Sequence, residues 1–206
     1  VRPRPSHVRE VTAGGNGRFK LRHATPIGIN VRSTVATYSN VHDELLKIFP
    51  HTQDAKAHGC KAGDFSYNTG KRRCPVCDGT GVSSLDVQFL PDVEIPCPAC
   101  HGSRYAREAG DVKLIDKHGR TTTLPRLMDC DVHTALDLCK DRKLVRQRLQ
   151  VLQDLGLGYL TLGEETPSLS GGEAPRLKLA SELERTPSPA AFVSDAPPTG
   201  LHPLAV

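Results

Sequence analysis

Tryptophan is absent from this 206-residue chain, and aromatic residues make up only 4% of it. A core built mainly from large aromatic rings is therefore excluded. Long apolar runs are also missing: none approaches the roughly 18 to 20 residues that cross a bilayer, so no membrane-spanning helix is expected. The length fits one core, and 18 Gly with 16 Pro favour short elements and many turns over a helical bundle.

A secretion signal is not evident either, because no charged, apolar and small-residue sequence in that order follows Val1. We therefore expect a cytoplasmic setting, in which the seven Cys are reduced thiols rather than disulfides. The net charge of +4 does not by itself distinguish a nucleic-acid binder from other proteins. Basic residues do gather over 1–30 and at Lys71, Arg72 and Arg73, and such clusters are either solvated surfaces or phosphate contacts.

Three helices are predicted from apolar residues at helical spacing. The first covers 41–49 and is stopped by Pro50. Two more are expected over 132–140 and 143–155, the second of which ends at Gly156.

Strands are predicted where polar and apolar residues alternate. This pattern occurs over 85–89 and 93–95, and a further hairpin is expected over 112–124. Residues 1–30 show little periodicity and several Gly and Pro, so we expect them to form a loose arm that leads into ordered structure.

Two Cys-x-x-Cys units are the strongest chemical signal in the sequence. Cys74 and Cys77 form the first, and Cys97 and Cys100 form the second, with nineteen residues between them. This spacing is typical of a four-thiolate zinc site, whereas a redox Cys-x-x-Cys normally occurs once. Four thiolates close the tetrahedral shell, so the predicted zinc is structural and fixes the intervening hairpin as a rigid finger. Glycines that permit tight turns follow both units: Gly79, Gly81 and Gly102.

A glycine turn precedes a predicted helix near the end of the chain. Ser170 is expected to cap this helix together with Glu173, and Gly171 and Gly172 expose amides at its positive end. Such an end can hold an anion or a phosphate. Further on, a predicted buried strand delivers the carboxylate of Asp195 to its edge, where metal and phosphate ligands lie in nucleotide-binding α/β folds.

The order and spacing of these motifs resemble UvrA, the damage-sensing subunit family of bacterial excinuclease ABC. Leu169 to Glu173 resembles the ABC ATPase signature, and the strand before Asp195 resembles the Walker B element. The segment from Cys74 to Tyr105 looks like the zinc-bearing part of the second nucleotide-binding half of UvrA. The likeness covers about residues 24–204 and continues in four short motifs: Pro26-Ile-Gly28, Ala36-Thr-Tyr38, Gly156-Leu-Gly-Tyr159 and Thr199-Gly-Leu-His202.

The resemblance implies an α/β fold, in the form of a partial ABC-type nucleotide-binding domain with an inserted four-cysteine zinc-finger module. It implies ATP-controlled binding to damaged double-stranded DNA in nucleotide excision repair, in a dimer-like arrangement, with handover to a UvrB-like helicase partner. Zinc is then expected on the four cysteines and magnesium on Asp195. The residues implied for the ATP signature are Ser170, Gly171, Gly172 and Glu173. The basic flank of the finger is expected to contact DNA phosphates through Lys71, Arg72, Arg73 and Arg104.

Five segments are expected on this basis. They are a basic, loosely ordered arm (1–23), an ABC-type segment that leads into the insertion (24–70), the zinc finger with its hairpin (71–106), a hairpin and helices that return to the ABC core (107–165), and the signature helix with the Walker B-like strand (166–206).

Several ATP-related positions depart from the family. No Gly-x-x-x-x-Gly-Lys-Ser/Thr motif occurs in the 206 residues, so unaided ATP binding is not expected. Ala24 stands where the family has Gln, and Ala196 stands where it has the Glu that polarises the attacking water. Pro175 removes an early hydrogen bond of the signature helix. The chain alone is therefore expected to lack ATPase activity while it keeps the DNA-finger architecture.

Three other interpretations stay open at this stage. One is a segment of a longer polypeptide whose Walker A motif lies upstream. Another is a stand-alone zinc-stapled interaction module, because the unit from Cys74 to Gly81 also resembles the zinc units of DnaJ-type chaperones. Only two such units are present here, and the second has Arg104 in place of its last Gly. The third is a remnant without function that does not fold alone, since half of an ABC core leaves sheet edges uncovered.

Overall fold

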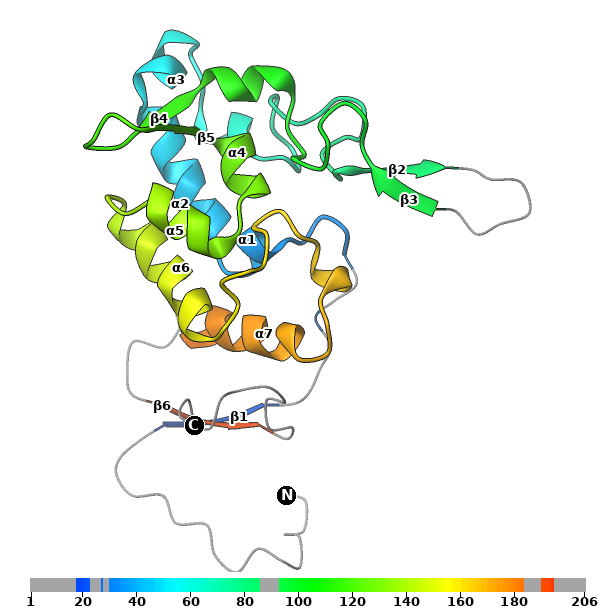
Figure 1. Cartoon of the computed structure of the whole chain (residues 1–206), viewed down its shortest axis with the longest axis vertical. Coiled ribbons are helices and arrows are strands. Elements are labelled where there is room, and N and C mark those ends of the chain that lie inside the picture. Colours follow the sequence, from blue (N-terminus) through cyan, green and yellow to red (C-terminus); the bar gives the residue numbers. More distant parts are fainter. Residues whose placement is uncertain (1–17, 23–26, 28–29, 86–92, 184–189, 195–206) are drawn as a thin grey trace, which may run out of the picture.

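Short helices form the body of the molecule, and the strands form separate pairs. The computed structural model describes residues 18–22, 27, 30–85, 93–183 and 190–194 (Figure 1). The α-helices are α1 (Val35–Tyr38), α2 (Val41–Ile48), α3 (Gln53–Ala57), α4 (Leu124–Asp129), α5 (Val132–Leu138), α6 (Lys143–Asp154) and α7 (Glu173–Leu183). The 3-10 helices are η1 (Phe49–His51), η2 (Ala62–Phe65), η3 (Arg107–Asp111) and η4 (Thr166–Ser168). Among the described residues, no helix has the length and apolar character needed to span a membrane.

The three predicted helices are confirmed as α2, α5 and α6. α2 and α6 pack against each other, and each buries an apolar face that includes Leu45 on α2 and Leu149 on α6. An ion pair between Glu44 Oε1 and Arg148 Nη2 (2.9 Å) joins the same two helices. Gly156, at φ 71°, follows the end of α6, because glycine adopts the left-handed conformation without a steric penalty.

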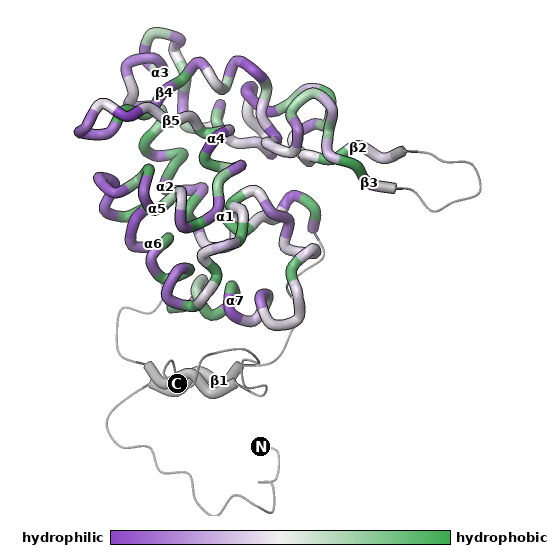
Figure 2. Tube along the Cα trace, in the orientation of Figure 1, coloured by the Kyte–Doolittle hydropathy of each residue, from purple (hydrophilic) through white to green (hydrophobic). Residues whose placement is uncertain are grey.

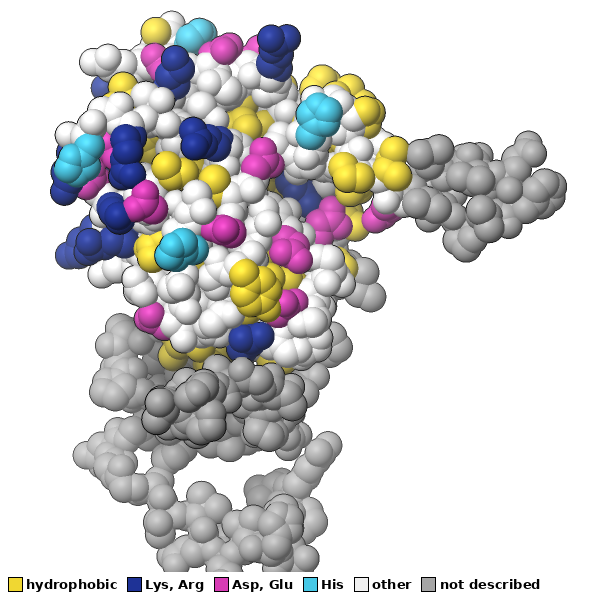
Figure 3. Space-filling model, in the orientation of Figure 1, with side chains coloured by type: hydrophobic (Ala, Val, Ile, Leu, Met, Phe, Trp, Pro, Cys, Tyr) yellow, Lys and Arg dark blue, Asp and Glu magenta, His cyan; other side chains and the backbone are white. Residues whose placement is uncertain are grey.

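Aliphatic side chains fill most of the core. Hydrophobic residues, green in Figure 2, recur along the helices of the body, and charged side chains of both signs are spread over the surface of the body in Figure 3. Each fully buried leucine contributes roughly 1.5–3 kcal/mol to folding. The buried aromatic residues of the described core are Phe49, Phe65, Tyr67 and Tyr105. Tyr67 and Tyr105 lie where the body meets the cysteine units: their ring centroids are 6.0 Å apart, and the guanidinium of Arg104 lies 5.3 Å from the centroid of the Tyr67 ring. Phe49 of η1 packs on Phe65, with ring centroids 5.9 Å apart.

The strands in the described residues form three two-stranded sheets. β4 (Lys113–Ile115) pairs antiparallel with β5 (Thr121–Thr123), which confirms the hairpin predicted over 112–124. The Asp116 carboxylate accepts the backbone N–H groups of His118 and Arg120 at 2.8 Å each and so fixes the turn between the two strands.

A second hairpin lies between the two cysteine units and projects from the body (Figure 1). β2 (Val82–Leu85) pairs antiparallel with β3 (Val93–Pro96). The strand expected over 93–95 is confirmed. The first strand begins earlier than expected, at Val82, and the rest of the predicted 85–89 segment lies outside the described residues.

A parallel pair joins strands from opposite ends of the chain. β1 (Arg18–Arg22) pairs with β6 (Ala190–Ser194), and β6 confirms the strand expected before Asp195. The expected loose arm over 1–23 is wrong for residues 18–22, because these residues form β1. Their partner comes from the far end of the sequence, so no local period revealed the pairing. The predicted α/β class is confirmed as a mixture of helices and strands.

A buried polar network lies where α2 meets the segment after the second cysteine unit. His42 is 3% exposed, and its Nε2 lies 2.8 Å from the hydroxyl of Tyr105. That hydroxyl donates to the carbonyl of Phe65 (2.9 Å), so the imidazole N–H is the donor to Tyr105. The hydroxyl of Tyr67 lies 3.1 Å from Thr34 Oγ1 in the same region. The Tyr105 bond ties the segment after Cys100 to α2, and the Tyr67 bond ties the segment before Cys74 to the N-cap of α1.

Burial makes His42 a pH-dependent element of stability. Desolvation lowers the pKa of His42 from 6.5 to about 4. His42 therefore binds a proton more weakly in the folded state than in the unfolded chain. This difference leaves the free energy of unfolding unchanged above pH 6.5 and lowers it as the pH falls from 6.5 toward 4. We expect about 2 kcal/mol of this loss between pH 7 and pH 5, measured by urea unfolding, and its absence in His42→Gln. The same pH dependence in both proteins would contradict this assignment.

Candidate metal centre

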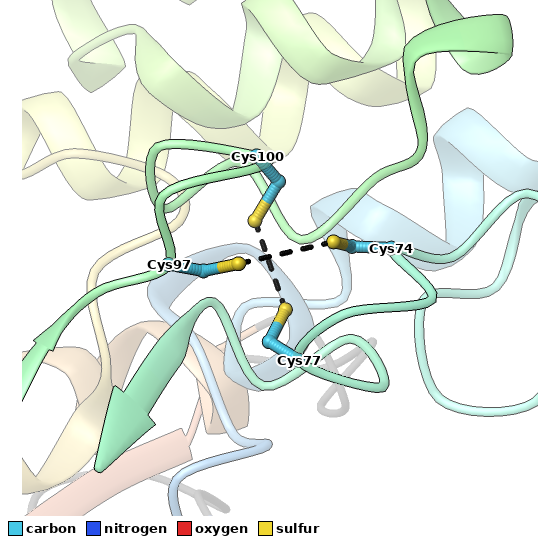
Figure 4. A group of neighbouring side chains, drawn as sticks. All are labelled: Cys74, Cys77, Cys97 and Cys100. Carbon is cyan, nitrogen blue, oxygen red and sulfur yellow. Dashed lines mark hydrogen bonds between the residues drawn. The ribbon is translucent and has the colours of Figure 1, made fainter. Parts of the chain in front are cut away.

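The four cysteines come together in one cluster (Figure 4). All four sulfurs lie within 4.8 Å of one another, with 3.9 Å between Cys74 Sγ and Cys97 Sγ and 3.7 Å between Cys77 Sγ and Cys100 Sγ. Sulfurs about 2.3 Å from one tetrahedral ion are about 3.8 Å apart, whereas a disulfide bond is about 2.05 Å long. The spacing therefore fits four ligands of a single metal ion and not two disulfides.

The two cysteine units follow the same backbone path. The N–H of Cys74 donates to the carbonyl of Arg104, and the N–H of Cys97 donates to the carbonyl of Gly81, both at 2.9 Å. In both cases the first cysteine of one unit donates its N–H to the carbonyl of the residue four positions after the second cysteine of the other unit. Three positions after that second cysteine have positive φ in each unit: Asp78 (50°), Gly79 (78°) and Gly81 (84°) in the first, and His101 (51°), Gly102 (92°) and Arg104 (72°) in the second.

Burial sets the electrostatics of the cluster, since each of its cysteines is at most 8% exposed. Burial raises the pKa of the Cys100 thiol to about 12. At Cys97 burial also acts to raise the pKa, but the backbone N–H groups of Cys100 and Ala99 outweigh it and the pKa falls to about 6. Four neighbouring thiolates repel one another, and a divalent cation offsets that repulsion. Thiolates as the complete donor set select zinc or another soft metal.

Arg104 is buried at the junction between the cysteine units and the body. Only 1% of the residue is exposed. Its Nη2 pairs with Glu165 Oε1 (2.9 Å), and its Nη1 donates to the carbonyls of Val31 (3.0 Å) and Gly79 (3.4 Å). Burial raises the pKa of Glu165, and the charge of Arg104 acts in the opposite direction. The predicted phosphate contact of Arg104 is wrong for this arrangement, because the guanidinium is committed to partners inside the protein.

The other predicted phosphate contacts differ in what they touch. Arg72 faces the body, where its guanidinium donates to the Glu108 carbonyl and lies 5.7 Å from the centroid of the Phe65 ring. Arg73 is partly exposed, and its Nε pairs with Asp78 Oδ1 (2.6 Å). Lys71 is exposed. Lys71 and Arg73 therefore lie on the surface beside the first cysteine unit.

The signature segment forms the capping box that the sequence predicts. The N–H of Ser170 donates to Glu173 Oε2 (2.6 Å), and the N–H of Glu173 donates weakly to Ser170 Oγ (3.4 Å). The other oxygen of Glu173 accepts the hydroxyl of Tyr159 (2.5 Å). Regular α-helix begins only at Glu173, because Pro175 has no N–H to donate to the carbonyl of Gly171. The cap confirms how α7 starts, while a contact of this segment with ATP stays a prediction.

Three predicted ATP-related positions lie outside the described residues: Ala24, Asp195 and Ala196. The three remaining cysteines, Cys60, Cys130 and Cys139, are not part of the metal cluster. Among them, Cys139 is buried, and burial raises the pKa of its thiol to about 12.

Several junction residues were not predicted from the sequence. Glu165, Tyr105 and His42 act through contacts between distant segments, for which the sequence offers no local pattern. Arg104 did leave a signal, because it replaces the last glycine of the repeated unit. A bulky residue with a left-handed backbone conformation indicates that contacts of its side chain offset the strain.

Comparison with known proteins places the chain in a family, although no protein-family profile matches it. UvrABC system protein A of Bacillus subtilis (strain 168) is 43% identical over 178 residues, which are 86% of this chain and 18% of that protein. The protein of the same name from Lactococcus lactis subsp. lactis is 41% identical over 179 residues, also 86% of this chain and 18% of that protein.

A solved structure supports the same relationship. UvrA2 from Deinococcus radiodurans is similar with a TM-score of 0.78 and 39% sequence identity, over 91% of this chain and 23% of that one. The chain thus spans less than a quarter of each of these proteins. On this similarity of sequence and structure, the chain belongs to the UvrA family.

Proposed function

We propose that this chain is a DNA-binding, damage-recognition segment of nucleotide excision repair, organised by a structural zinc ion. The observation that carries the proposal is the four-cysteine cluster at the base of a projecting hairpin, in a chain 43% identical to UvrABC system protein A. The metal-binding role of the cluster is inferred from its four cysteine sulfurs. Four buried thiolates leave no open position for a reacting water, so the ion holds structure and does not catalyse hydrolysis.

The hairpin is the proposed DNA-facing element. β2 and β3 begin and end beside the cysteines: Cys97 directly follows β3, and its N–H bonds to the carbonyl of Gly81, just before β2. A metal ion on the cysteines therefore fixes the direction in which the hairpin points. Lys71 and Arg73 flank its base and are the proposed phosphate contacts, which position a protein without reading base sequence. Sequence-independent contacts suit a protein that must recognise deformed DNA anywhere.

The ATP-related part of the proposal uses the start of α7. Ser170, Gly171 and Gly172 lie at the positive end of this eleven-residue helix, where an anionic γ-phosphate from a second nucleotide-binding site would be stabilised. Asp195 is the proposed magnesium ligand. The ABC-type segments 24–70 and 166–206, the homodimer and the UvrB-like helicase partner belong to the same proposal. So does the absence of ATP hydrolysis by the chain alone, which lacks the phosphate-binding lysine motif.

DNA binding by the zinc-loaded chain tests the proposal. We expect fluorescence anisotropy to show tighter binding to a damaged duplex than to an undamaged one, without nucleotide, and binding that weakens as salt increases. Lys71→Ala should lower the slope of log K against log salt by about one, since one phosphate contact is lost. The matched control is Lys56→Ala, which removes an exposed lysine from α3, away from the hairpin (Figure 1).

The controls decide how a negative result is interpreted. A folded, zinc-loaded chain that does not bind either duplex would contradict the DNA-binding role of this segment. Equal slopes for Lys71→Ala and Lys56→Ala would retain DNA binding but remove Lys71 from the contact surface.

A further inference from the structure

Arg104 stands out because a costly backbone conformation holds a fully buried charged side chain. Its φ of 72° lies in the left-handed region, which the matching residue of the first unit, Gly81, reaches without penalty. A non-glycine residue there is strained, because its Cβ comes too close to the following carbonyl oxygen. Its Nε is also buried without a hydrogen-bond partner among the described residues. Such a residue persists only when its side-chain contacts stabilise the structure by more than these costs.

Those contacts connect four separate segments of the chain. One guanidinium bonds to Gly79 in the first cysteine unit, to Val31 before α1 and to Glu165 before η4, and it lies over the ring of Tyr67. The backbone carbonyl of Arg104 accepts the N–H of a metal-ligand residue, Cys74 (2.9 Å). A movement of either cysteine unit therefore acts directly on the position of this side chain.

Glu165 carries the connection toward the signature segment. Its backbone forms an antiparallel bridge with Thr34, and the N–H of Thr166 donates to the carbonyl of Ser33 (2.9 Å). The carbonyl of Glu165 accepts both the N–H (3.1 Å) and the hydroxyl (2.8 Å) of Ser168, which closes η4. Ser170, the cap of α7, follows two residues later. The position of Glu165 thus sets the path by which the chain enters α7.

We propose that Arg104 is a positioning residue that couples metal binding at the four cysteines to the conformation of residues 164–170. With the metal bound, the cysteine units hold Arg104, and Arg104 holds Glu165 and the entry to α7. When the metal leaves, the anchor of Arg104 relaxes and residues 164–170 loosen although they contain no metal ligand. This inference rests on the proposed zinc site but not on DNA or ATP binding.

Hydrogen–deuterium exchange of the whole chain, with and without zinc, tests the coupling. Zinc removal from the wild-type chain is expected to speed exchange at least tenfold over 164–170, as well as over 74–100. Arg104→Gly keeps the left-handed backbone of the unit and removes only the side chain. Its zinc-loaded form should already exchange fast over 164–170, and zinc removal should add little there.

Several controls separate coupling from a general loss of stability. Amides of α2 and α6 should exchange at the wild-type rate in the zinc-loaded variant. Arg120→Ala removes an exposed arginine with two ion pairs, to Asp116 and Asp137, and should leave 164–170 unchanged. Glu165→Gln breaks the same ion pair from the other side and should reproduce the effect of Arg104→Gly even if that variant folds poorly.

The zinc content of the same samples distinguishes the outcomes. A wild-type chain without zinc would refute the proposed zinc site itself. A zinc-loaded wild type in which zinc removal leaves 164–170 unchanged would overturn only the coupling. So would wild-type exchange over 164–170 in both zinc-loaded Arg104→Gly and zinc-loaded Glu165→Gln.

Discussion

Replacing Cys97 by Ser is expected to abolish stoichiometric zinc binding. Cys97 is fully buried, and its sulfur lies 3.9 Å from that of Cys74, so its replacement leaves three of the four thiolates in the cluster of the described residues. Loss of an outer-shell partner alone typically costs 10- to 100-fold in metal affinity, and loss of a direct ligand should cost more than about 100-fold. The measurement is metal content per chain, followed by competition with a chromogenic chelator.

The same substitution should also disorder the base of the hairpin. Zinc binding to such units is itself folding free energy, because the site does not exist in the unfolded chain. A suitable control is Cys130→Ser, which changes a partly exposed thiol outside the cluster. That variant should keep one zinc per chain. Full zinc occupancy in the Cys97 variant, or equal losses in both variants, would contradict a four-thiolate site.

Gly79→Ala is expected to be the most damaging single-methyl addition at the junction. A Cβ at position 79 would lie 1.8 Å from the backbone carbonyl oxygen of Tyr67, which is far closer than atoms in contact can approach. The φ of 78° adds a backbone cost of roughly 1–2 kcal/mol for any non-glycine residue. The clash with the backbone adds roughly 1–3 kcal/mol, because neither the Gly79 turn nor the backbone of Tyr67 can move freely.

Gly102→Ala is the matched control, since Gly102 occupies the same place in the second unit. Its φ is 92°, but among the described residues no atom beyond its two chain neighbours lies within 4 Å of the position that a Cβ would take. We therefore expect Gly102→Ala to cost only the backbone term, roughly 1–2 kcal/mol, and Gly79→Ala to cost clearly more. Urea unfolding of the two zinc-loaded variants measures the difference. Equal losses would show that the first unit does not pack on Tyr67 as described.

The predictions that succeeded depend on neighbours in the sequence. Helix α6 could be predicted because Val145, Leu149 and Leu152 recur on one face and Gly156 follows the helix. The cysteine cluster could be predicted because two residues between ligands already place both sulfurs near one ion. The cap at Ser170 follows from Glu173 three positions later, again a local relationship.

The predictions that failed depend on distant segments or on burial. The pairing of β1 with β6 brings together opposite ends of the sequence, which a local period cannot reveal. The glycine-containing unit before Arg104 predicts an arginine on the surface of the finger, but the guanidinium pairs inside the protein with Glu165, sixty-one positions later in the sequence. A charge pattern alone does not tell a solvated arginine from one that is paired in the interior.

These differences change where the DNA-facing surface is expected. With Arg104 inside the junction and Arg72 facing the body, two of the four predicted phosphate contacts, Lys71 and Arg73, remain on the surface beside the first cysteine unit. Asp78 pairs with Arg73 and also with Arg32 (3.0 Å), which lowers the positive charge further. DNA binding is therefore expected to depend less on charge at this site than on the proposed fixing of the hairpin's direction by the metal.

The coordination of that metal is the most direct test of the account. X-ray absorption at the zinc edge of the purified chain should show four sulfur ligands at about 2.3 Å and no nitrogen or oxygen ligand. This result would confirm that all four cysteines hold one ion at the base of the hairpin. A first shell with fewer than four sulfurs, or a folded chain that binds no zinc and has disulfides among these cysteines, would contradict it.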